Sequence, residues 1–369
     1  MTTNPLDADR PPELPRGGRR RGGNGDIRQR RRDESLMVPE AEFQSYYGHQ
    51  VVKPAPWKHE ISTYLFLGGV AAGSGLIGAG GAAAGLPSLR RIGRFTAVGA
   101  AALGGAALAK DLGKPSRAIN MMRTVKLTSP MSVGSWILTA FSGFAGVAMM
   151  AELGRSLLDH DSLLAKALRV VEPPATIGSA LFAPPLAAYT AVLLSDTASP
   201  TWHESYRELP FVFVSSANAA ASGWALLAAP TAENGPARKL AAVSAALEVA
   251  AFERMKQTMG PTLAEPLHAG RAGTLVKASK VLTIGGAIGA VVFGHNRAGA
   301  ALSGLALMAG SACTRFGVVE AGIESAKDPR YTVEPQKQRL ERRRADGVAE
   351  GSITTSRSTV APALQGGSR

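Results

Sequence analysis

The chain has 369 residues and a formal net charge of +13, with 41 Lys and Arg against 28 Asp and Glu. A basic balance indicates nucleic-acid binding only where the charge lies on a folded surface, and here 11 cations precede Ile61 and 10 follow Thr314. We therefore expect no nucleic-acid partner. The single cysteine, Cys313, excludes an internal disulfide, a CxxCH haem-attachment motif and an iron–sulfur cluster held by this chain alone.

The composition divides the chain into a central bundle and two polar tails. Residues 1–45 are rich in Pro, Gly, Arg and Asp and predict a disordered basic N-terminal tail. Residues 326–369 predict a polar, largely disordered C-terminal tail, and residues 46–325 between them are rich in Ala and Gly. No apolar stretch follows the early Arg runs until Ile61, so the start of the chain does not have the usual form of a cleavable signal peptide.

The central region contains a series of long apolar runs. A helix needs about 20 mostly apolar residues to cross the hydrocarbon core, and several of these runs reach that length without a charge. The shorter runs become long enough if flanking Lys and Arg side chains extend to the interface. The fold class we expect is an all-α integral membrane protein with about eight transmembrane helices. The runs are Ile61–Leu89, Phe95–Ala109, Leu127–Ala151, Pro173–Ser195, Leu209–Ala232, Leu240–Phe252, Val281–Gly294 and Ala298–Thr314.

The distribution of cations between the two sides predicts the orientation. Eight helices would place both termini on one side, and that side then has 32 Lys and Arg, counting every cation after Thr314, against nine on the other. By the positive-inside rule, we expect a multi-pass protein of the cell membrane with both termini in the cytoplasm. Contact with anionic lipid, worth about 1 kcal/mol for each cation near the surface, is then an ordinary role for the basic tails.

Two pairs of glycines in the first run have the spacing that lets membrane helices approach closely. These small-xxx-small pairs are Gly69–Gly73 and Gly81–Gly85. An Ala- and Gly-rich segment also produces such spacings by chance, so the pattern alone does not decide between contact and coincidence.

The third apolar run begins with more hydroxyl groups than a plain membrane anchor needs. Pro130 suits the first turn of a helix, where its missing N–H costs nothing. Thr128 and Ser129 can cap that helix start and leave N–H groups directed at a polar ligand. Either an ordinary capped helix start or a ligand site at its mouth would explain the pattern.

One acidic residue within an apolar run and the six histidines are the remaining candidates for proton transfer or haem binding. Glu248 lies within an apolar run, and an intramembrane carboxyl costs about 2.5–3.5 kcal/mol at a helix centre on insertion scales, so it is a proton-relay candidate. A structural hydrogen bond to Ser or Thr of a neighbouring helix is the alternative. All six His lie in predicted tails, loops or helix ends, which disfavours a haem held between facing helices.

Two stretches resemble the NrfD family, the membrane subunits of polysulfide-reductase-like complexes. The segment YYGHQVVKPAPWKHEISTYLFLGGVAAGSGL, residues 46–76, resembles the entry to the first helix of that family. The segment KDLGKPSRAINMMRTVKLTSPMSVGSW, residues 110–136, resembles the second loop and the entry to the third helix. The pieces D-L-G-[KR]-P, N-M-x-R and S-P-M-S-x-G-S-W are specific in combination, and the resemblance covers about residues 46–155.

This resemblance implies a subunit of eight or nine helices that interacts with a quinone or quinol and binds no haem. It also implies a ferredoxin-like iron–sulfur partner subunit, often joined to a molybdopterin oxidoreductase such as a formate-dehydrogenase-like enzyme. The expected function is therefore a quinone-interacting membrane subunit of a multi-subunit oxidoreductase, which passes electrons between the quinone pool and the iron–sulfur subunit. The chain is expected to bind menaquinone or ubiquinone and no metal, and to act within a complex rather than as an enzyme alone.

A quinone site needs hydrogen-bond donors for two carbonyl oxygens, an apolar slot and an ionisable group within reach of the headgroup. The predicted topology places both family-like stretches at the cytoplasmic face, where we expect them to form the headgroup pocket and to dock the iron–sulfur subunit. Besides the proton-relay candidate Glu248, the proposed catalytic residues are His59 and Asp111. The quinone-binding candidates are His59, Tyr64, Asn120, Arg123, Ser129, Ser132 and Trp136.

Two other functions remain open at this point. The chain could be a pure anchor that holds a redox partner and binds no quinone. It could also be a transporter or channel with Glu248 in its pathway, although the motif-rich loop of the first half has no counterpart in the second half, as inverted repeats would require. Trp136, in turn, could be an interfacial aromatic residue without a ligand.

Overall fold

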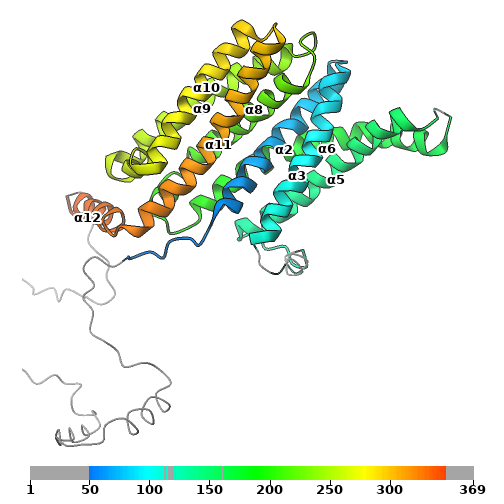
Figure 1. Cartoon of the computed structure of the whole chain (residues 1–369). Coiled ribbons are helices and arrows are strands. Elements are labelled where there is room, and N and C mark those ends of the chain that lie inside the picture. Colours follow the sequence, from blue (N-terminus) through cyan, green and yellow to red (C-terminus); the bar gives the residue numbers. More distant parts are fainter. Residues whose placement is uncertain (1–49, 112–113, 115–119, 121, 160, 346–369) are drawn as a thin grey trace, which may run out of the picture. The chain divides into compact units, whose positions relative to one another are not determined.

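This computed structural model describes residues 50–111, 114, 120, 122–159 and 161–345, and every regular element within those ranges is a helix (Figure 1). The elements are α2 (His59–Ala83), α3 (Pro87–Asp111), α5 (Pro130–Leu157), α6 (Leu163–Ser195), α7 (Pro200–Glu204), α8 (Leu209–Ala228), α9 (Gly235–Ala264), the 3-10 helix η3 (Glu265–Leu267), α10 (Gly270–Phe293), α11 (Arg297–Lys327) and α12 (Arg330–Ala345).

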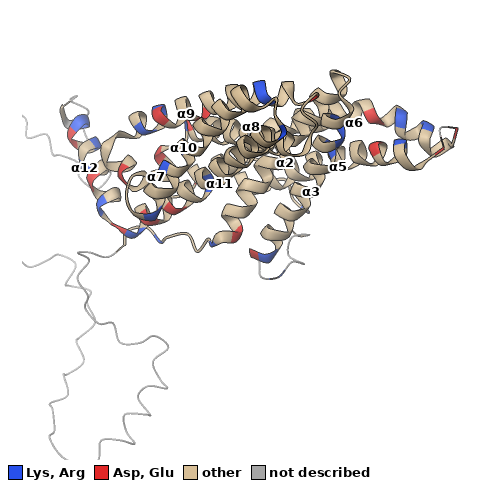
Figure 2. Ribbon diagram, turned by 45° about the horizontal axis from the view of Figure 1, so that its top comes forward, with Lys and Arg blue, Asp and Glu red and all other residues tan. Residues whose placement is uncertain are grey.

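The predicted membrane bundle is confirmed, with one difference in the helix count. Seven of the described helices are long and apolar enough to cross a membrane, namely α2, α3, α5, α6, α8, α10 and α11. The remaining expected run, Leu240–Phe252, forms the middle of α9, which is 30 residues long. Charged residues on both sides of that run, such as Lys239 and Glu253, interrupt every longer apolar window. The long helices carry most of their charged residues toward their ends (Figure 2).

The helices form two packed groups. In the first group α2 lies against α3 and α6, and α5 packs on α6; in the second group α11 lies against α8 and α10, and α9 packs on α8. Helix α2 also packs against α8 and α11, so it joins the groups (Figure 1). We call them the first half (α2, α3, α5 and α6) and the second half (α8, α9, α10 and α11).

Successive long helices run in opposite directions, so the bundle has two ends. At the first end, which we call the tail end, Lys110 at the close of α3 forms a 3.0 Å ion pair with Glu60 at the start of α2. At the far end, the Ser88 hydroxyl donates to Glu233 Oε1 at 2.9 Å and links α3 to the loop before α9. Helix α2 begins and α11 ends at the tail end, because α9 runs the length of the bundle together with the seven apolar helices and makes the number of long helices even.

The glycine spacings have different structural roles. A Cβ on Gly73 would lie 2.6 Å from Ala221 Cβ, so this glycine permits the close approach of α2 and α8, and Gly69 lies on the same contact. Gly81 similarly faces the backbone at Arg90, where α2 meets the start of α3. Gly85 has a φ of 66° and open space around it, so it serves the turn between α2 and α3. This turn divides the first predicted run.

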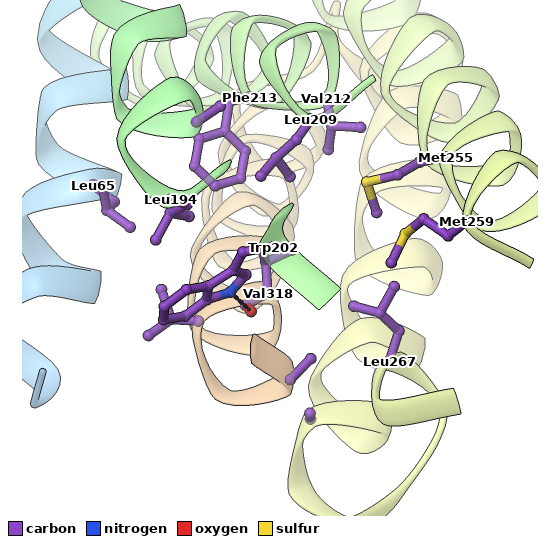
Figure 3. Close-up of a cluster of buried hydrophobic side chains, with 14 of the residues drawn as sticks. Leu65, Leu194, Trp202, Leu209, Val212, Phe213, Met255, Met259, Leu267 and Val318 are labelled. Carbon is purple, nitrogen blue, oxygen red and sulfur yellow. Dashed lines mark hydrogen bonds between the residues drawn. The ribbon is translucent and has the colours of Figure 1, made fainter. Parts of the chain in front are cut away.

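The largest group of buried apolar side chains among the described residues lies at the tail end and comes from helices of both halves, including Leu65 of α2 and Leu194 of α6 (Figure 3). Its centre is Trp202 of α7, whose indole Nε1 donates to the carbonyl oxygen of Val318 at 2.7 Å. Trp57, which precedes α2, stacks on Trp202 with ring centroids 5.3 Å apart. The chain entering α2 is thereby held against the second half.

The segments expected to be tails are only partly described. The N-terminal tail, residues 1–45, lies outside the described residues. In the C-terminal segment, α11 continues to Lys327 and α12 spans Arg330–Ala345, and residues 346–369 lie outside the described residues. Helix α12 is tied to the bundle by a 2.7 Å ion pair between Arg330 and Glu265.

Candidate functional site

The tail end holds the residues predicted at the start of the first helix and the end of the second. The Glu60–Lys110 ion pair fixes the start of α2 beside the end of α3. His59 and Asp111 flank that pair in sequence, and both are exposed at this end. The structure therefore places these two candidates on the same surface, although no contact joins them directly in the described part of the chain.

His59 faces the second half of the bundle. Its ring stacks on Phe316 of α11, with centroids 6.3 Å apart. Beside it lies a cavity of about 50 Å³, whose wall combines polar groups of Ser62 and Arg271 with apolar side chains that include Leu275. An ionisable ring thus lies beside an aromatic wall at the mouth of a small cavity.

Tyr64 lies one turn and a half deeper in α2 than His59. Its side chain is 3% exposed, and its hydroxyl has no hydrogen-bond partner among the described residues. The ring lies close to Gly104 of α3, where a Cβ would be 3.5 Å from Tyr64 Cδ2. The hydroxyl is a buried donor that remains free for another group.

The hydroxyl groups at the mouth of α5 bond within their own loop. Ser129 caps the helix by accepting from the N–H of Ser132 at 3.5 Å, with Pro130 in the first turn. The Ser132 hydroxyl accepts from the N–H of Lys126 at 3.0 Å and donates to the carbonyl oxygen of Thr124 at 3.3 Å. These bonds are those of a capped helix start, and they hold the preceding loop against α5.

The remaining candidates of this region point outward. Asn120 and Arg123 are exposed and belong to one turn, in which the N–H of Arg123 donates to the carbonyl oxygen of Asn120 at 3.2 Å. Trp136 is 37% exposed on the first turns of α5. The predicted site thus divides into two groups at the tail end. We call them the α2 group (His59 and Tyr64) and the α5 group (Asn120, Arg123, Ser129, Ser132 and Trp136).

Glu248 lies in the interior of the second half. It is 4% exposed, and the hydroxyl of Thr314 donates to its Oε1 at 2.7 Å. Its Oε2 has no hydrogen-bond partner among the described residues. Thr314 is in turn 2.5 Å from the hydroxyl of Ser279. A structural hydrogen bond to a neighbouring threonine is therefore present, but it satisfies only one oxygen of the carboxyl group.

Arg315, which interacts with Glu248, lies inside the bundle and not in the C-terminal tail. It was counted among the tail cations on the predicted cytoplasmic face, yet it is 1% exposed within α11, so that count falls by one. Its Nη2 donates to the carbonyl oxygen of Phe213 at 2.7 Å, and its guanidinium lies 3.8 Å from the centroid of the Phe213 ring. It also interacts electrostatically with Glu248.

A signal for this position was present in the sequence. Apolar residues continue beyond Arg315, from Phe316 to Val319, so the run did not end there. A buried carboxyl on one helix also calls for a cation on another, because an isolated charge in the interior is costly.

A second buried group of charges lies in the first half toward the far end, and we call it the far-end network. Arg94, 4% exposed, bonds to Glu152 at 3.0 Å and to Glu172 at 2.8 Å. Each carboxylate also accepts from a second arginine. Arg90 Nε donates to Glu152 at 2.8 Å, and Arg155 Nη2 donates to Glu172 at 2.5 Å. The arginines, counted before as loop cations, bind α3, α5 and α6 together.

The comparisons with known proteins agree with this architecture. The sequence pattern described as polysulphide reductase, NrfD, matches residues 49–248, which is more than half of the chain. The match extends from the entry of α2 to Glu248, well beyond the 46–155 region of the motifs. A search of curated proteins finds no match to the chain. Members of the matching family are membrane subunits of redox complexes. With its bundle of apolar helices and this match, the chain belongs to the polysulphide reductase NrfD family.

Proposed function

We propose that this chain is the subunit through which a multi-subunit oxidoreductase exchanges electrons with the membrane quinone pool, and that an iron–sulfur subunit is its redox partner. The observation that carries the proposal is the family match, because it covers every candidate residue from His59 to Glu248. A ferredoxin-like partner, with or without a molybdopterin subunit behind it, is part of the same proposal.

The residues of the α2 group fit a quinone headgroup in chemical type. Tyr64 offers a buried hydroxyl that has no partner among the described residues, on the side of α2 that meets α3. The cavity beside His59, which Tyr64 does not line, has an aromatic and aliphatic wall with polar groups that include Ser62 and Arg271. A bound quinone would supply two-electron, two-proton chemistry. The side chains would orient the headgroup, with Tyr64 donating a hydrogen bond and His59 holding a proton at the edge of the site.

The α5 group has a different role in the proposal. Ser129 and Ser132 hold the loop before α5 in place through hydrogen bonds, so the exposed Asn120, Arg123 and Trp136 are presented at the tail end. Exposed polar and aromatic side chains on a positioned loop suit contact with a protein partner or a headgroup. We propose that this surface lies on the cytoplasmic side of the cell membrane and meets the iron–sulfur subunit.

Glu248 is proposed as the proton relay of the site. The carboxyl group is buried, has one oxygen without a partner in the described part of the chain and lies beside Arg315, an arrangement that suits a group that gains and loses a proton. Its hydrogen bond from Thr314 fixes the other oxygen.

The experiment that tests the proposal measures quinone-linked electron transfer in membranes that contain the intact complex. The variants are His59→Ala, Asp111→Asn and Arg123→Ala, and each is expected to lower the rate at least tenfold at an unchanged amount of membrane-bound protein, as loss of a positioned acid–base or binding group does. Arg207→Ala is the matched control, because Arg207 is an exposed cation of the tail end outside both groups.

Full activity in all three variants would remove this pocket. If the complex assembles and transfers electrons to soluble acceptors while no variant changes the quinone reaction, the chain is an anchor and quinone binds elsewhere.

A further inference from the structure

A cavity of about 350 Å³ lies between α5 and α6, next to the far-end network. That volume is many times the roughly 10–15 Å³ that one water requires, so the cavity has room for a larger group. Two arginines, Arg155 and Arg169, form the polar part of its wall. The rest of the lining is small or aliphatic, namely Ala151, Gly154, Ala165 and Leu168. The cavity is therefore a site with a positive wall.

The position of this cavity along its helices is that of the lipid headgroups. The uncharged run of α5 ends at Ala151 and that of α6 begins at Pro173, so the cavity lies just beyond both runs. A transmembrane helix leaves the hydrocarbon core where its apolar run ends, and Lys and Arg side chains there reach the interface. Charged residues mark the far ends of α5 and α6 in this way (Figure 2). A group in the cavity would thus lie in the headgroup region.

Arg155 has N–H donors left for a ligand. Its Nη2 donates to Glu172, and the side chain is still 44% exposed. A guanidinium carries five N–H donors, so others remain on Arg155. Arg169 is also exposed, and Lys166, one turn before it on α6, is 58% exposed. The cavity thus has a second guanidinium in its wall and an ammonium group close by.

The charge balance around the cavity favours an anion. At the far end, α3, α5, α6 and the loop between α5 and α6 contribute six cations against four acids. The acids Glu152 and Glu172 are already compensated, because each of their oxygens accepts from an arginine. A surplus of positive charge at one place attracts a negative partner. The cations are Arg90, Arg91, Arg94, Arg155, Lys166 and Arg169, and the other two acids are Asp159 and Asp161.

An exposed apolar face of α6 continues from the level of the cavity into the membrane. Leu163, Val170 and Ile177 lie seven residues apart along α6, and each is exposed. Seven residues make about two turns, so the three side chains lie on one face of the helix. An exposed apolar face on a transmembrane helix is a contact surface for acyl chains.

We propose that this cavity binds the headgroup of an anionic phospholipid in the leaflet at the far end, and that the acyl chains of the lipid follow the apolar face of α6. Arg155 and Arg169 donate to the phosphate oxygens, which the planar donors of a guanidinium fit well, and Lys166 adds charge at the rim. A soluble phosphate would meet the same arginines, but only a lipid also covers Leu163, Val170 and Ile177. The binding is noncovalent and does not depend on the proposed quinone reaction.

The test measures how strongly a spin-labelled lipid quenches a fluorophore beside the cavity in phosphatidylcholine vesicles. In a Cys313→Ala background, Ala167→Cys places the fluorophore on the exposed side of α6 next to Lys166. Leu302→Cys is the matched reporter, since it is exposed near the far end of α11 and lies outside the cavity. At Ala167→Cys, spin-labelled phosphatidylglycerol is expected to bind at least about tenfold better than spin-labelled phosphatidylcholine, because each cation near an anionic headgroup contributes about fivefold. At Leu302→Cys the two lipids should quench alike.

Removing the cations tests whether the preference belongs to this cavity. Lys166→Gln combined with Arg169→Gln is expected to lower the preference at Ala167→Cys about fivefold for each lost cation. Lys166→Gln alone serves the same purpose if the double variant does not assemble. Lys239→Gln removes an exposed cation at the far end of α9 and is the control, with no change expected.

Equal quenching by the two lipids at Ala167→Cys would overturn the proposal, and so would a preference that survives the loss of the cations. A further arm adds inorganic phosphate and compares it with chloride at the same ionic strength, because salt screens charges. The proposal expects phosphate to act no more strongly than chloride. Loss of the preference with phosphate alone would show a site for a soluble anion and overturn the lipid as its occupant.

Discussion

The two halves of the bundle bury charge in different ways. In the far-end network of the first half, both carboxylates receive arginines at each oxygen, and Arg94 also donates to the Thr176 hydroxyl at 2.9 Å. In the second half, Glu248 and Arg315 are as deeply buried, yet one carboxyl oxygen and two guanidinium nitrogens lack partners among the described residues. The Glu248 group borders a small cavity between α9, α10 and α11, and Arg155 of the far-end network borders a more open one between α5 and α6.

This difference in hydrogen bonding leads us to expect different roles for the far-end network and for the Glu248–Arg315 group. In the far-end network every carboxylate oxygen is bonded, although Arg94 Nε has no partner among the described residues. A buried ion pair whose carboxylates are fully bonded holds helices in place, and breaking it leaves a costly unpaired charge. A buried carboxylate with one unbonded oxygen can change its protonation state, because protonation removes a negative charge that the surrounding groups compensate only in part. We therefore expect the far-end network to determine stability and the Glu248 group to determine activity.

The largest stability effect is expected in the far-end network. Arg94→Leu leaves Glu152 and Glu172 with fewer partners, and the loss should be about 3 kcal/mol, the lower part of the range for breaking a buried pair, since Arg90 and Arg155 remain. Unfolding of the detergent-solubilised protein measures it. The matched control is Arg91→Leu, whose side chain is 59% exposed and should cost less than about 1 kcal/mol. Equal losses would show that the network does not hold the first half.

A smaller effect is expected where the two halves meet. Gly73→Ala would place a Cβ 2.6 Å from Ala221 Cβ, so α2 and α8 must separate, at a cost of about 1–3 kcal/mol. Gly80→Ala in the same helix is the control, since nothing lies within 4 Å of its added Cβ. If both variants unfold alike, α2 is not the close link between the halves that the comparison requires.

The smallest stability effect and the largest functional one are expected at Glu248. Glu248→Gln keeps an acceptor for the Thr314 hydroxyl, so stability should change by less than about 1 kcal/mol. Quinone-linked turnover should fall about a hundredfold, as loss of an acid–base group does. If Glu248→Gln lowers the stability but leaves the turnover of the assembled complex normal, Glu248 has a structural role like that of the far-end network.

Apolar runs predicted the helices because chain length and hydropathy are local properties. Pairing between helices is not local, so no sequence pattern predicts that Arg90, Arg94 and Arg155, three of the nine cations on the second side, bind carboxylates within the bundle. Arg315 was missed for the same reason, since its burial depends on Phe213 and Glu248 from other helices. The glycine spacing left open whether Gly85 contacts another helix, and its positive φ shows that it serves the turn that ends α2.

The site was predicted in part. The sequence placed His59 and Asp111 at one end correctly through the topology, because an even number of crossings fixes which helix ends meet. It could not show that Ser129 and Ser132 use their hydrogen bonds within the loop, since these depend on the path of residues 124–126.

The most direct test of the central claim is equilibrium binding of a menaquinone analogue to the chain in lipid nanodiscs. The account predicts saturable binding that differs between the oxidised and reduced analogue and weakens at least tenfold in a His59→Ala, Tyr64→Phe double variant, with the Arg207→Ala control unchanged. Uptake of the analogue no greater than into nanodiscs without protein, in both redox states, would contradict it.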